Sequence, residues 1–401
     1  MAATAVPRND RNHAIDVFRA LTMMLMIFVN DLWTLRGVPE WLPHVPAGVD
    51  GMGLSDVVFP AFLFIVGLSI PLAINNRWKK GERTHQILLH VLSRSLALLI
   101  MGVFHVNLES YQAEGALFSK QLWQLLLTLS FFLIWLDYPK EPEKKPRKWV
   151  GKTLGWGLLV LLAATYEGGT PEAPIWMGFY WWGILGLIGW AYLIGSLVYL
   201  ATRGRQVWIG LAFLLCMGFS VLAKLGMLGF LLPIKPYIWL IDDGATPALA
   251  LAGMLVTGFY RDHFKKGRED RFWWLLSGLA VTALFLGLAS RPLWGIHKIG
   301  SSPSWVLICI AISMAVFGLL VVLVEKHRKK HWFDGIRAAG TSTLTCYLLP
   351  YIHYGLLAMT GLVLPEVLRT GLPGILKSLL YAWLIIQLTG FLERRRVRLK
   401  I

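Results

Sequence analysis

The fold class is decided by residues 12–76, which read NHAIDVFRALTMMLMIFVNDLWTLRGVPEWLPHVPAGVDGMGLSDVVFPAFLFIVGLSIPLAINN. Two apolar runs, each close to the ~20 residues that cross a bilayer as a helix, flank a loop that holds His44. Asn30 lies near the end of the first run, and Asp56 opens the second. Polar side chains suited to proton chemistry therefore gather at one membrane face, where a purely structural helix pair would not need them.

The composition is that of a membrane protein that crosses the bilayer several times. Hydrophobic residues make up 56% of the chain and charged residues 15%, and the mean hydropathy is +0.57. No polar stretch is long enough to form a separate soluble domain. We therefore expect an all-α fold, a polytopic transmembrane helix bundle that forms a single domain over residues 1–401.

The apolar runs predict about twelve spans, separated by short polar connections. They lie roughly at 17–35, 56–76, 85–106, 121–138, 149–166, 180–201, 206–225, 245–260, 271–290, 304–325, 341–360 and 373–392.

The basic residues are concentrated in alternate connections. The formal net charge is +16, which in a soluble protein would suggest nucleic acid as a partner. Here the excess of Lys and Arg in every second connection is the positive-inside pattern, so nucleic acid is excluded and these connections are placed in the cytoplasm. We expect a multi-pass protein of the cytoplasmic (inner) membrane, with both termini cytoplasmic and the His44 loop outside. The basic connections are 77–84, 139–148, 202–206, 261–271 and 326–337.

Neither the first apolar run nor the cysteines suggest processing or a metal. The run at 20–35 is too long for the hydrophobic core of a cleavable signal and has no small-residue cleavage site, so we interpret it as an uncleaved anchor. Cys216, Cys309 and Cys346 all lie inside apolar runs, at spacings that suit neither a disulfide framework nor a metal site. We expect no bound metal.

Tryptophans near the predicted span ends, Trp123 and Trp305 among them, are expected to anchor the helices at the membrane interface. This position suits an aromatic ring with one polar atom, because the ring contacts lipid while the N–H reaches water. Interfacial anchoring therefore accounts for most of these residues without any ligand.

Arg94 lies well inside the third predicted span. A charge at the centre of a span costs at least ~2.5–3.5 kcal/mol, so Arg94 must face protein, water or an anionic ligand. Two interpretations are open: a structural pair with a carboxylate or backbone carbonyls, and an anchor for a phosphate. No Asp or Glu lies at the centre of a predicted span, which counts against an ion-coupled transporter.

His44, Asp56 and Asn30 could together carry out acyl-transfer chemistry. Histidine suits general-base work near neutral pH, and a neighbouring carboxylate can orient its ring and stabilise the imidazolium. Asn30 could donate a hydrogen bond to a developing oxyanion. The alternative is a solvated loop histidine with Asp56 capping the second helix.

Several blocks of the sequence resemble the heparan-α-glucosaminide N-acetyltransferase family and its bacterial relatives, including 179–193 and the basic tail that ends at Lys400-Ile401. The most specific is IDVFRALTMMLMIFVN at 15–30, followed by a histidine and by GLSDVVFPAFLFIVG at 53–67. The resemblance continues through SRSLALLIMG at 93–102, PLWGIHKIGSSPSWVL at 292–307 and AAGTSTLTCYLL at 338–349.

This resemblance implies a transfer of acetyl from cytosolic acetyl-CoA to a sugar amine across the membrane. It assigns His44 as the catalytic histidine, Asn30 as its neighbouring asparagine and Asp56 as the aspartate that opens the next span. Cationic side chains are expected to bind the cofactor, since phosphates leaving water need cationic partners. The candidates are Arg19, Arg94, Lys298 and Lys400.

We therefore expect a transmembrane acyltransferase that uses acetyl-CoA as co-substrate and a glucosamine-type sugar as acceptor. Direct transfer with His44 as base and an acyl-histidine intermediate are both open. An amino-sugar transporter is the alternative function, and a membrane scaffold without a small-molecule site is a third. The expected partners are the bilayer, acetyl-CoA and the sugar, with a homodimer left open.

Overall fold

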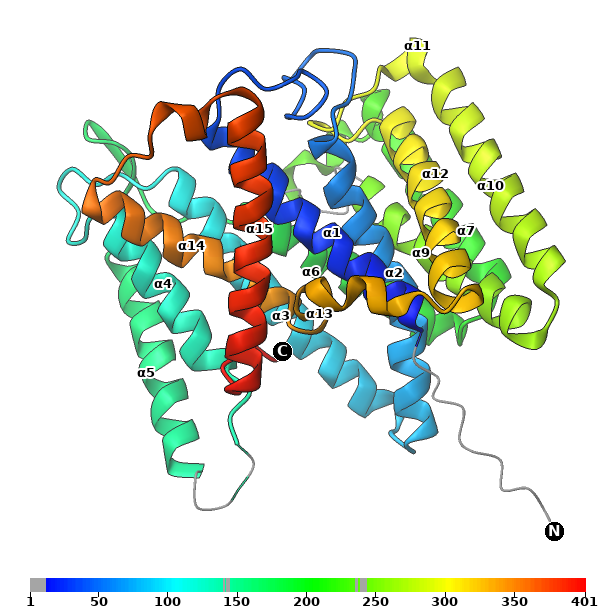
Figure 1. Ribbon diagram of the computed structural model, residues 1–401, viewed down its shortest axis with the longest axis horizontal. Helices are drawn as coiled ribbons and strands as arrows, with labels where there is room; N and C mark the ends of the chain where they lie inside the picture. Colours follow the sequence, from blue (N-terminus) through cyan, green and yellow to red (C-terminus); the bar gives the residue numbers. More distant parts are fainter. Residues whose placement is uncertain (1–11, 140, 142–144, 235–236, 239–243) are drawn as a thin grey trace.

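The computed structural model describes residues 12–139, 141, 145–234, 237–238 and 244–401, and these are mostly helical (Figure 1). Within these ranges the only strands are β1 (Gly168–Thr170) and β2 (Ala173–Ile175), which pair as a short antiparallel hairpin. The expected all-α membrane fold is confirmed.

A long helix lies at each predicted span. They are α1 (His13–Asp31), α2 (Ser55–Lys79), α3 (Thr84–Glu109), α4 (Lys120–Trp135), α5 (Lys145–Ala164), α6 (Ile184–Thr202), α7 (Gln206–Lys224), α9 (Ala245–Asp262), α10 (Glu269–Ala289), α12 (Pro303–Leu320), α14 (Thr343–Thr360) and α15 (Gly371–Arg394).

Seven described helices are long and apolar enough to cross a membrane, namely α2, α3, α6, α7, α10, α15 and α12 together with its continuation to Lys326. The count of twelve spans remains a prediction, because the other helices are shorter or less apolar. Short helical segments join the long ones: Leu32–Thr34, Gly229–Ile234, Phe264–Lys266, α11 (Arg291–Trp294), Lys330–Ile336, α13 (Arg337–Thr341) and Glu366–Arg369.

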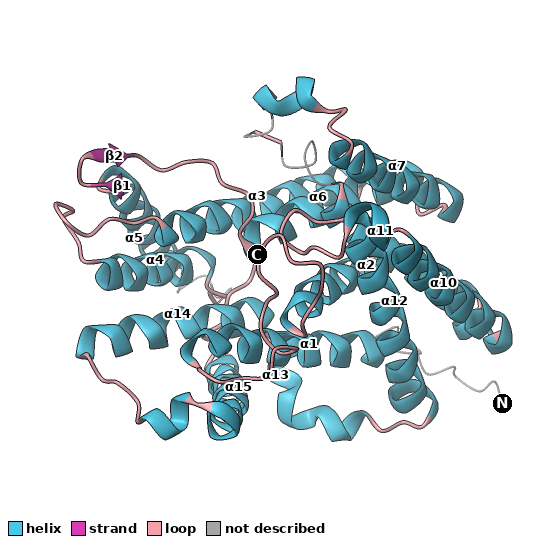
Figure 2. Ribbon diagram, turned by 90° about the horizontal axis from the view of Figure 1, so that it is seen from above, coloured by secondary structure: helices cyan, strands magenta, loops and turns pink. Residues whose placement is uncertain are grey.

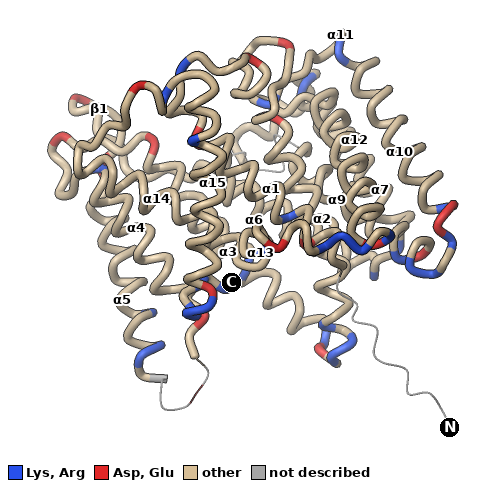
Figure 3. The backbone as a smooth tube through the Cα atoms, viewed as in Figure 1, with Lys and Arg blue, Asp and Glu red and all other residues tan. Residues whose placement is uncertain are grey.

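Successive long helices run in alternate directions, so their connections gather at two ends of the bundle. We call the end that carries connections 32–54 and 290–302 the loop end, and the end that carries 80–83, 263–268 and 327–336 the basic end. Figure 3 shows Lys and Arg clustered along the basic end.

Helix α2 is held at the centre by close contact with α9. A Cβ added to Gly67 would lie 1.8 Å from the carbonyl oxygen of Ala250, and one added to Gly253 would lie 2.1 Å from that of Phe64. Small residues at such crossings let two backbones approach, which is how helices commonly pack in membranes. The close fit fixes α2, whose first turn carries Asp56.

A buried ion pair fixes the loop end of α1. Lys377 Nζ and Ser378 Oγ of α15 each lie 2.6 Å from Oδ2 of Asp31, and the hydroxyl of Tyr354 on α14 donates to Oδ1. The Asp31 side chain is 4% exposed. A buried carboxylate needs such donors, because an unpaired charge inside protein or lipid is strongly unfavourable. The end of α1 next to Asn30 is therefore tied to α14 and α15.

The α2–α9 contact generates a stability prediction. Gly67→Ala should lower the free energy of unfolding by about 1–3 kcal/mol, because its new methyl must push the α9 backbone away. Gly278→Ala is the matched control: it also lies in a helix, and its Cβ would meet nothing within 4 Å. We expect that control to be neutral or stabilising, by up to ~1 kcal/mol of helix propensity. Thermal unfolding of the detergent-solubilised variants measures both; equal midpoints for Gly67→Ala and the wild type would contradict the packing argument.

Candidate active site

His44 and Asp56 form a close pair at the loop end. Nδ1 of His44 lies 2.7 Å from Oδ1 of Asp56. The Asp56 side chain is 2% exposed, whereas that of His44 is 47% exposed. The carboxylate is thus inside the protein, while one edge of the imidazole is open to solvent. This is the arrangement expected of a general base whose ring is oriented by a carboxylate. His44 is thus half exposed but paired with Asp56, and is not a histidine without a protein partner.

Backbone donors hold the other oxygen of Asp56. Oδ2 accepts the N–H of Gly53 at 2.9 Å and that of Val45 at 3.1 Å. The loop closes so tightly here that a Cβ at Gly53 would lie 2.1 Å from the carbonyl oxygen of Pro43. The loop before α2 therefore folds around the Asp56 carboxylate, which accepts all of these hydrogen bonds and donates none. Nδ1 of His44 then carries the proton donated to Asp56, and Nε2 keeps its lone pair.

Lys298 is the third member of this group, although it lies far from His44 and Asp56 in the sequence. Its Nζ is 3.0 Å from Nδ1 and 3.2 Å from Nε2 of His44, and 3.9 Å from Oδ1 of Asp56. Burial lowers the pKa of the Lys298 amine, and the carboxylate of Asp56 partly opposes this by favouring the ammonium.

Asp50 holds the connection that carries Lys298 against the His44 loop. It accepts hydrogen bonds from the Ile296 N–H at 2.7 Å and from Nε of Arg291 at 2.9 Å. These two donors hold the pKa of Asp50 below its ordinary value. The N–H of Gly51 returns a bond to the Ile296 carbonyl at 3.1 Å. Sequence analysis did not identify this contact, because its only signal is opposite charge in two distant loops.

Helix α12 supports the pair from below. Nε1 of Trp305 donates to the backbone carbonyl of Asp56 at 3.1 Å, and the Trp305 side chain is only 3% exposed. Trp123 is fully buried as well, with its N–H on the carbonyl of Leu162. The expectation that these two tryptophans anchor the helices at the interface is wrong, because their polar atom is satisfied inside the protein.

Asn30 lies at the same end but not in contact with the pair. Asn30 is exposed to solvent in the last turn of α1. Among the described residues, no hydrogen bond joins Asn30 to His44 or Asp56. The structure therefore brings His44, Asp56 and Lys298 together, and it places Asn30 where the fixed end of α1 can present it to a ligand.

A large cavity extends from the basic end toward this group. It measures about 1680 Å³, and its wall includes α1, α2, α3 and α6. Its lining reaches Met26, one helical turn (~6 Å) below Asn30, and Phe62, about 9 Å along α2 from Asp56. Figure 2 shows helices surrounding the middle of the bundle, where the last described residues of the chain lie.

Three of the predicted cofactor-binding cations line this cavity: Arg19, Arg94 and Lys400. The Arg94 guanidinium lies 4.9 Å from the ring centre of Tyr192, and its Nε has no hydrogen-bond partner. Within the described residues, Arg94 makes no ion pair with a carboxylate. Lys298 is not in the lining, because it lies beside His44 instead.

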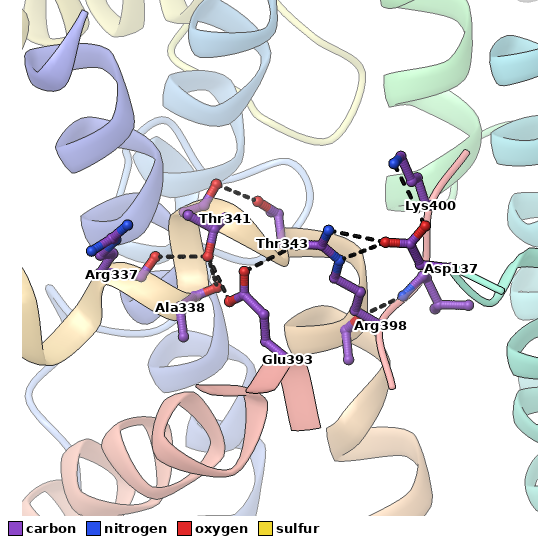
Figure 4. Close-up of polar contacts among 11 residues, drawn as sticks. Asp137, Arg337, Ala338, Thr341, Thr343, Glu393, Arg398 and Lys400 are labelled. Atoms are coloured by element: carbon purple, nitrogen blue, oxygen red, sulfur yellow. Dashed lines mark hydrogen bonds and ion pairs between the residues drawn. The ribbon is translucent and has the colours of Figure 1, made fainter. Parts of the chain in front are cut away.

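Residues 399–401, which follow α15, line this cavity, and Figure 4 shows the polar contacts next to them. Arg398 donates to Oδ2 of Asp137 through Nε at 3.0 Å and Nη2 at 2.9 Å, and to Glu393 at 3.2 Å. Lys400 Nζ lies 3.5 Å from the other oxygen of Asp137. Burial disfavours the charge of Asp137, yet these cations outweigh it and hold its pKa below the ordinary value. The network holds Lys400 in the lining of the cavity.

The fold and this site together define a polytopic α-helical membrane protein with a histidine–carboxylate group at one end and a cation-lined cavity opening at the other. The chain belongs to the family described as "Domain of unknown function (DUF5009)", whose profile matches residues 11–227.

Part of the chain is similar to characterised enzymes. It is 33% identical over 98 residues to heparan-alpha-glucosaminide N-acetyltransferase of Mus musculus and 32% identical over 97 residues to that of Homo sapiens. Each alignment covers 24% of this chain and 14% of the relative. The resemblance found in the sequence is confirmed.

The surroundings of Lys298 generate a prediction about its titration. The Asp56 carboxylate raises the pKa of Lys298 against the effect of burial. Asp56→Asn should therefore lower that pKa further, so that the neutral amine reacts at a lower pH. Competitive amine labelling across a pH series, followed by peptide mass spectrometry, measures the change. Lys120, whose Nζ donates to the Glu109 carbonyl at the end of α3, is the internal control and should not respond. An unchanged Lys298 profile in Asp56→Asn would contradict the electrostatic description.

Proposed function

We propose that this protein is an acyltransferase that moves an acetyl group from cytosolic acetyl-CoA to the amine of a glucosamine-type sugar on the opposite side of the cytoplasmic membrane. The observation that carries the proposal is the cavity, which extends from cations at the basic end to Met26 and Phe62, on the two helices that carry Asn30 and Asp56. The similarity to N-acetyltransferases supports the same kind of reaction.

The cavity suits a long ligand with a charged head and a less polar arm. Its volume of about 1680 Å³ exceeds the ~300–1,000 Å³ of common ligand pockets. Arg19, Arg94 and Lys400 would bind the phosphates through charge-assisted hydrogen bonds. Met26 and Phe62 line the deeper part, where the pantetheine arm would place the thioester near the loop end.

The residues at the loop end would then perform the transfer. The amine nitrogen attacks the thioester carbonyl carbon, and Nε2 of His44 takes the amine proton while Asp56 stabilises the imidazolium. The C–S bond breaks, and the thiolate takes the proton back from His44. Asn30 would donate to the oxyanion. In the two-step variant, Nε2 itself attacks first and the C–S bond breaks with loss of the thiolate. The amine then attacks the acyl-histidine, the bond from the acyl carbon to Nε2 breaks, and the thiolate takes up the amine proton.

Charge asymmetry supports the orientation. The basic end would face the cytoplasm, together with both termini, because Lys and Arg are retained on that side during insertion. Acetyl-CoA then has access to the cavity mouth from the cytoplasm, and the sugar reaches His44 from outside. The proposal holds equally for a monomer and a homodimer.

An amino-sugar transporter is not favoured. A carrier has no need of a histidine–carboxylate pair at one end of the bundle, and the similar curated proteins are acetyltransferases. Purified protein given labelled acetyl-CoA and glucosamine distinguishes the two functions. Labelled N-acetylglucosamine supports the enzyme, whereas glucosamine uptake into liposomes without label transfer would support the carrier.

The catalytic assignment predicts a graded loss of activity. His44→Ala should reduce turnover by at least ~10²–10⁴-fold, because it removes the base or nucleophile. Asn30→Ala should cost roughly 10²–10³-fold if it is an oxyanion donor, and Asp56→Asn less than His44→Ala. Acetyl-CoA affinity should change little in all three, since none of them lines the cavity. Single-turnover label transfer and calorimetry are the measurements. Near-normal turnover by His44→Ala would contradict the assignment.

The cofactor assignment predicts a loss of binding. Arg94→Ala should weaken acetyl-CoA binding by ~1.5–3 kcal/mol, the usual contribution of a hydrogen bond to a charged group. Arg205→Ala is the matched control, since Arg205 is exposed at the basic end and lies outside the cavity lining. Calorimetry on folded protein measures both affinities. Equal affinities for the two variants would place the phosphates elsewhere.

A further inference from the structure

The Lys298 ammonium lies beside the His44 ring, 3.0 Å from Nδ1 and 3.2 Å from Nε2. Nδ1 of His44 already donates to Asp56 at 2.7 Å, so it has no lone pair to offer a second donor. Because the ammonium is nearly equidistant from the two ring nitrogens, it lies off the lone-pair axis of Nε2 and leaves that lone pair open. A positive charge therefore stands next to the nitrogen that would take up the amine proton.

The side chain of Lys298 can move while its backbone cannot. The backbone lies in a turn closed by the Ser301 N–H on the Lys298 carbonyl and by the Ser302 N–H on the His297 carbonyl, each at 3.0 Å. Asp50 anchors the same connection at Ile296. By contrast, the Lys298 side chain is 27% exposed, and a flexible chain of four carbons carries its ammonium. Its ammonium can thus redirect by bond rotation without any change in the loop.

We propose that Lys298 is a catalytic residue whose ammonium, held beside His44, turns to the thioester when it arrives and donates to the carbonyl oxygen of the acyl group. This inference rests on the proposed acetyl transfer. As the amine nitrogen bonds to the carbonyl carbon, negative charge develops on that oxygen, and the ammonium stabilises it. Lys298 itself neither gains nor loses a proton, and the C–S bond breaks as the charge returns.

The arrangement of charges around Lys298 is consistent with this role. Asp56 of α2, at 3.9 Å, keeps a negative charge near the ammonium. The thiol of Cys309 on α12 lies 4.0 Å from the backbone carbonyl oxygen of Asp56. Buried surroundings increase the strength of an ammonium–oxyanion interaction, because water screens it less. Burial also lowers the pKa of Lys298, so the positive charge of the ammonium is stabilised by Asp56 rather than by solvent.

The test compares Lys298→Met, Lys298→Arg and the control Lys120→Met. Lys298→Met should lower the single-turnover rate of acetyl transfer to glucosamine by about 10²–10³-fold, the usual loss of an oxyanion donor, with acetyl-CoA affinity unchanged within twofold. Lys298→Arg keeps the charge and should recover at least tenfold of that loss. Lys120→Met should match the wild type. Thermal unfolding midpoints establish that each variant is folded.

Each other outcome overturns the inference in a recognisable way. A Lys298→Met enzyme within threefold of the wild-type rate would show that the ammonium takes no part. Equal losses in Lys298→Met and Lys298→Arg would show that charge is not the property that matters. A parallel loss of acetyl-CoA affinity would make Lys298 a binding residue. A wild-type protein that transfers no acetyl group would overturn the proposed function as well, which separates the two failures.

Discussion

The carboxylate of Asp56 is the interaction on which the loop end depends. One oxygen orients the His44 ring and the other accepts two backbone N–H groups of its own loop. Because the side chain is almost fully buried, losing any of these partners would leave a charge poorly solvated. The same requirement for compensation brings Lys298 close, so one buried charge organises the loop, the imidazole and the lysine. The contact of α2 with α9 at Gly67 keeps this charge in place.

The cavity and the loop-end group divide the bundle into two functional halves. Cations at the basic end suit phosphates, while the deeper lining is apolar up to Met26 and Phe62. A ligand with a charged head and a thin arm could therefore reach the loop end without its head crossing the membrane. The buried pair of Asp31 and Lys377 ties the loop end of α1 to α15.

The helices and the pairing of His44 with Asp56 could be predicted from the sequence, whereas the positions of Lys298 and Trp305 depend on contacts between distant parts of the chain. His44 and Asp56 are joined by a short loop between two apolar runs, so their proximity followed from the topology. Lys298 was expected among cofactor phosphates, because nothing local indicates which loop the 292–307 block docks against. Trp305 was misplaced for a related reason: hydropathy cannot distinguish a helix face that contacts lipid from one that contacts protein, since both are apolar.

Transfer across a sealed membrane tests the central claim most directly. Vesicles that contain the purified protein are loaded with glucosamine, and labelled acetyl-CoA is added outside, where it reaches only molecules with the basic end outward. The account predicts labelled N-acetylglucosamine inside intact vesicles, and none with His44→Ala. Label transfer that occurs only after detergent mixes the two compartments would contradict an acetyl group passing along the cavity.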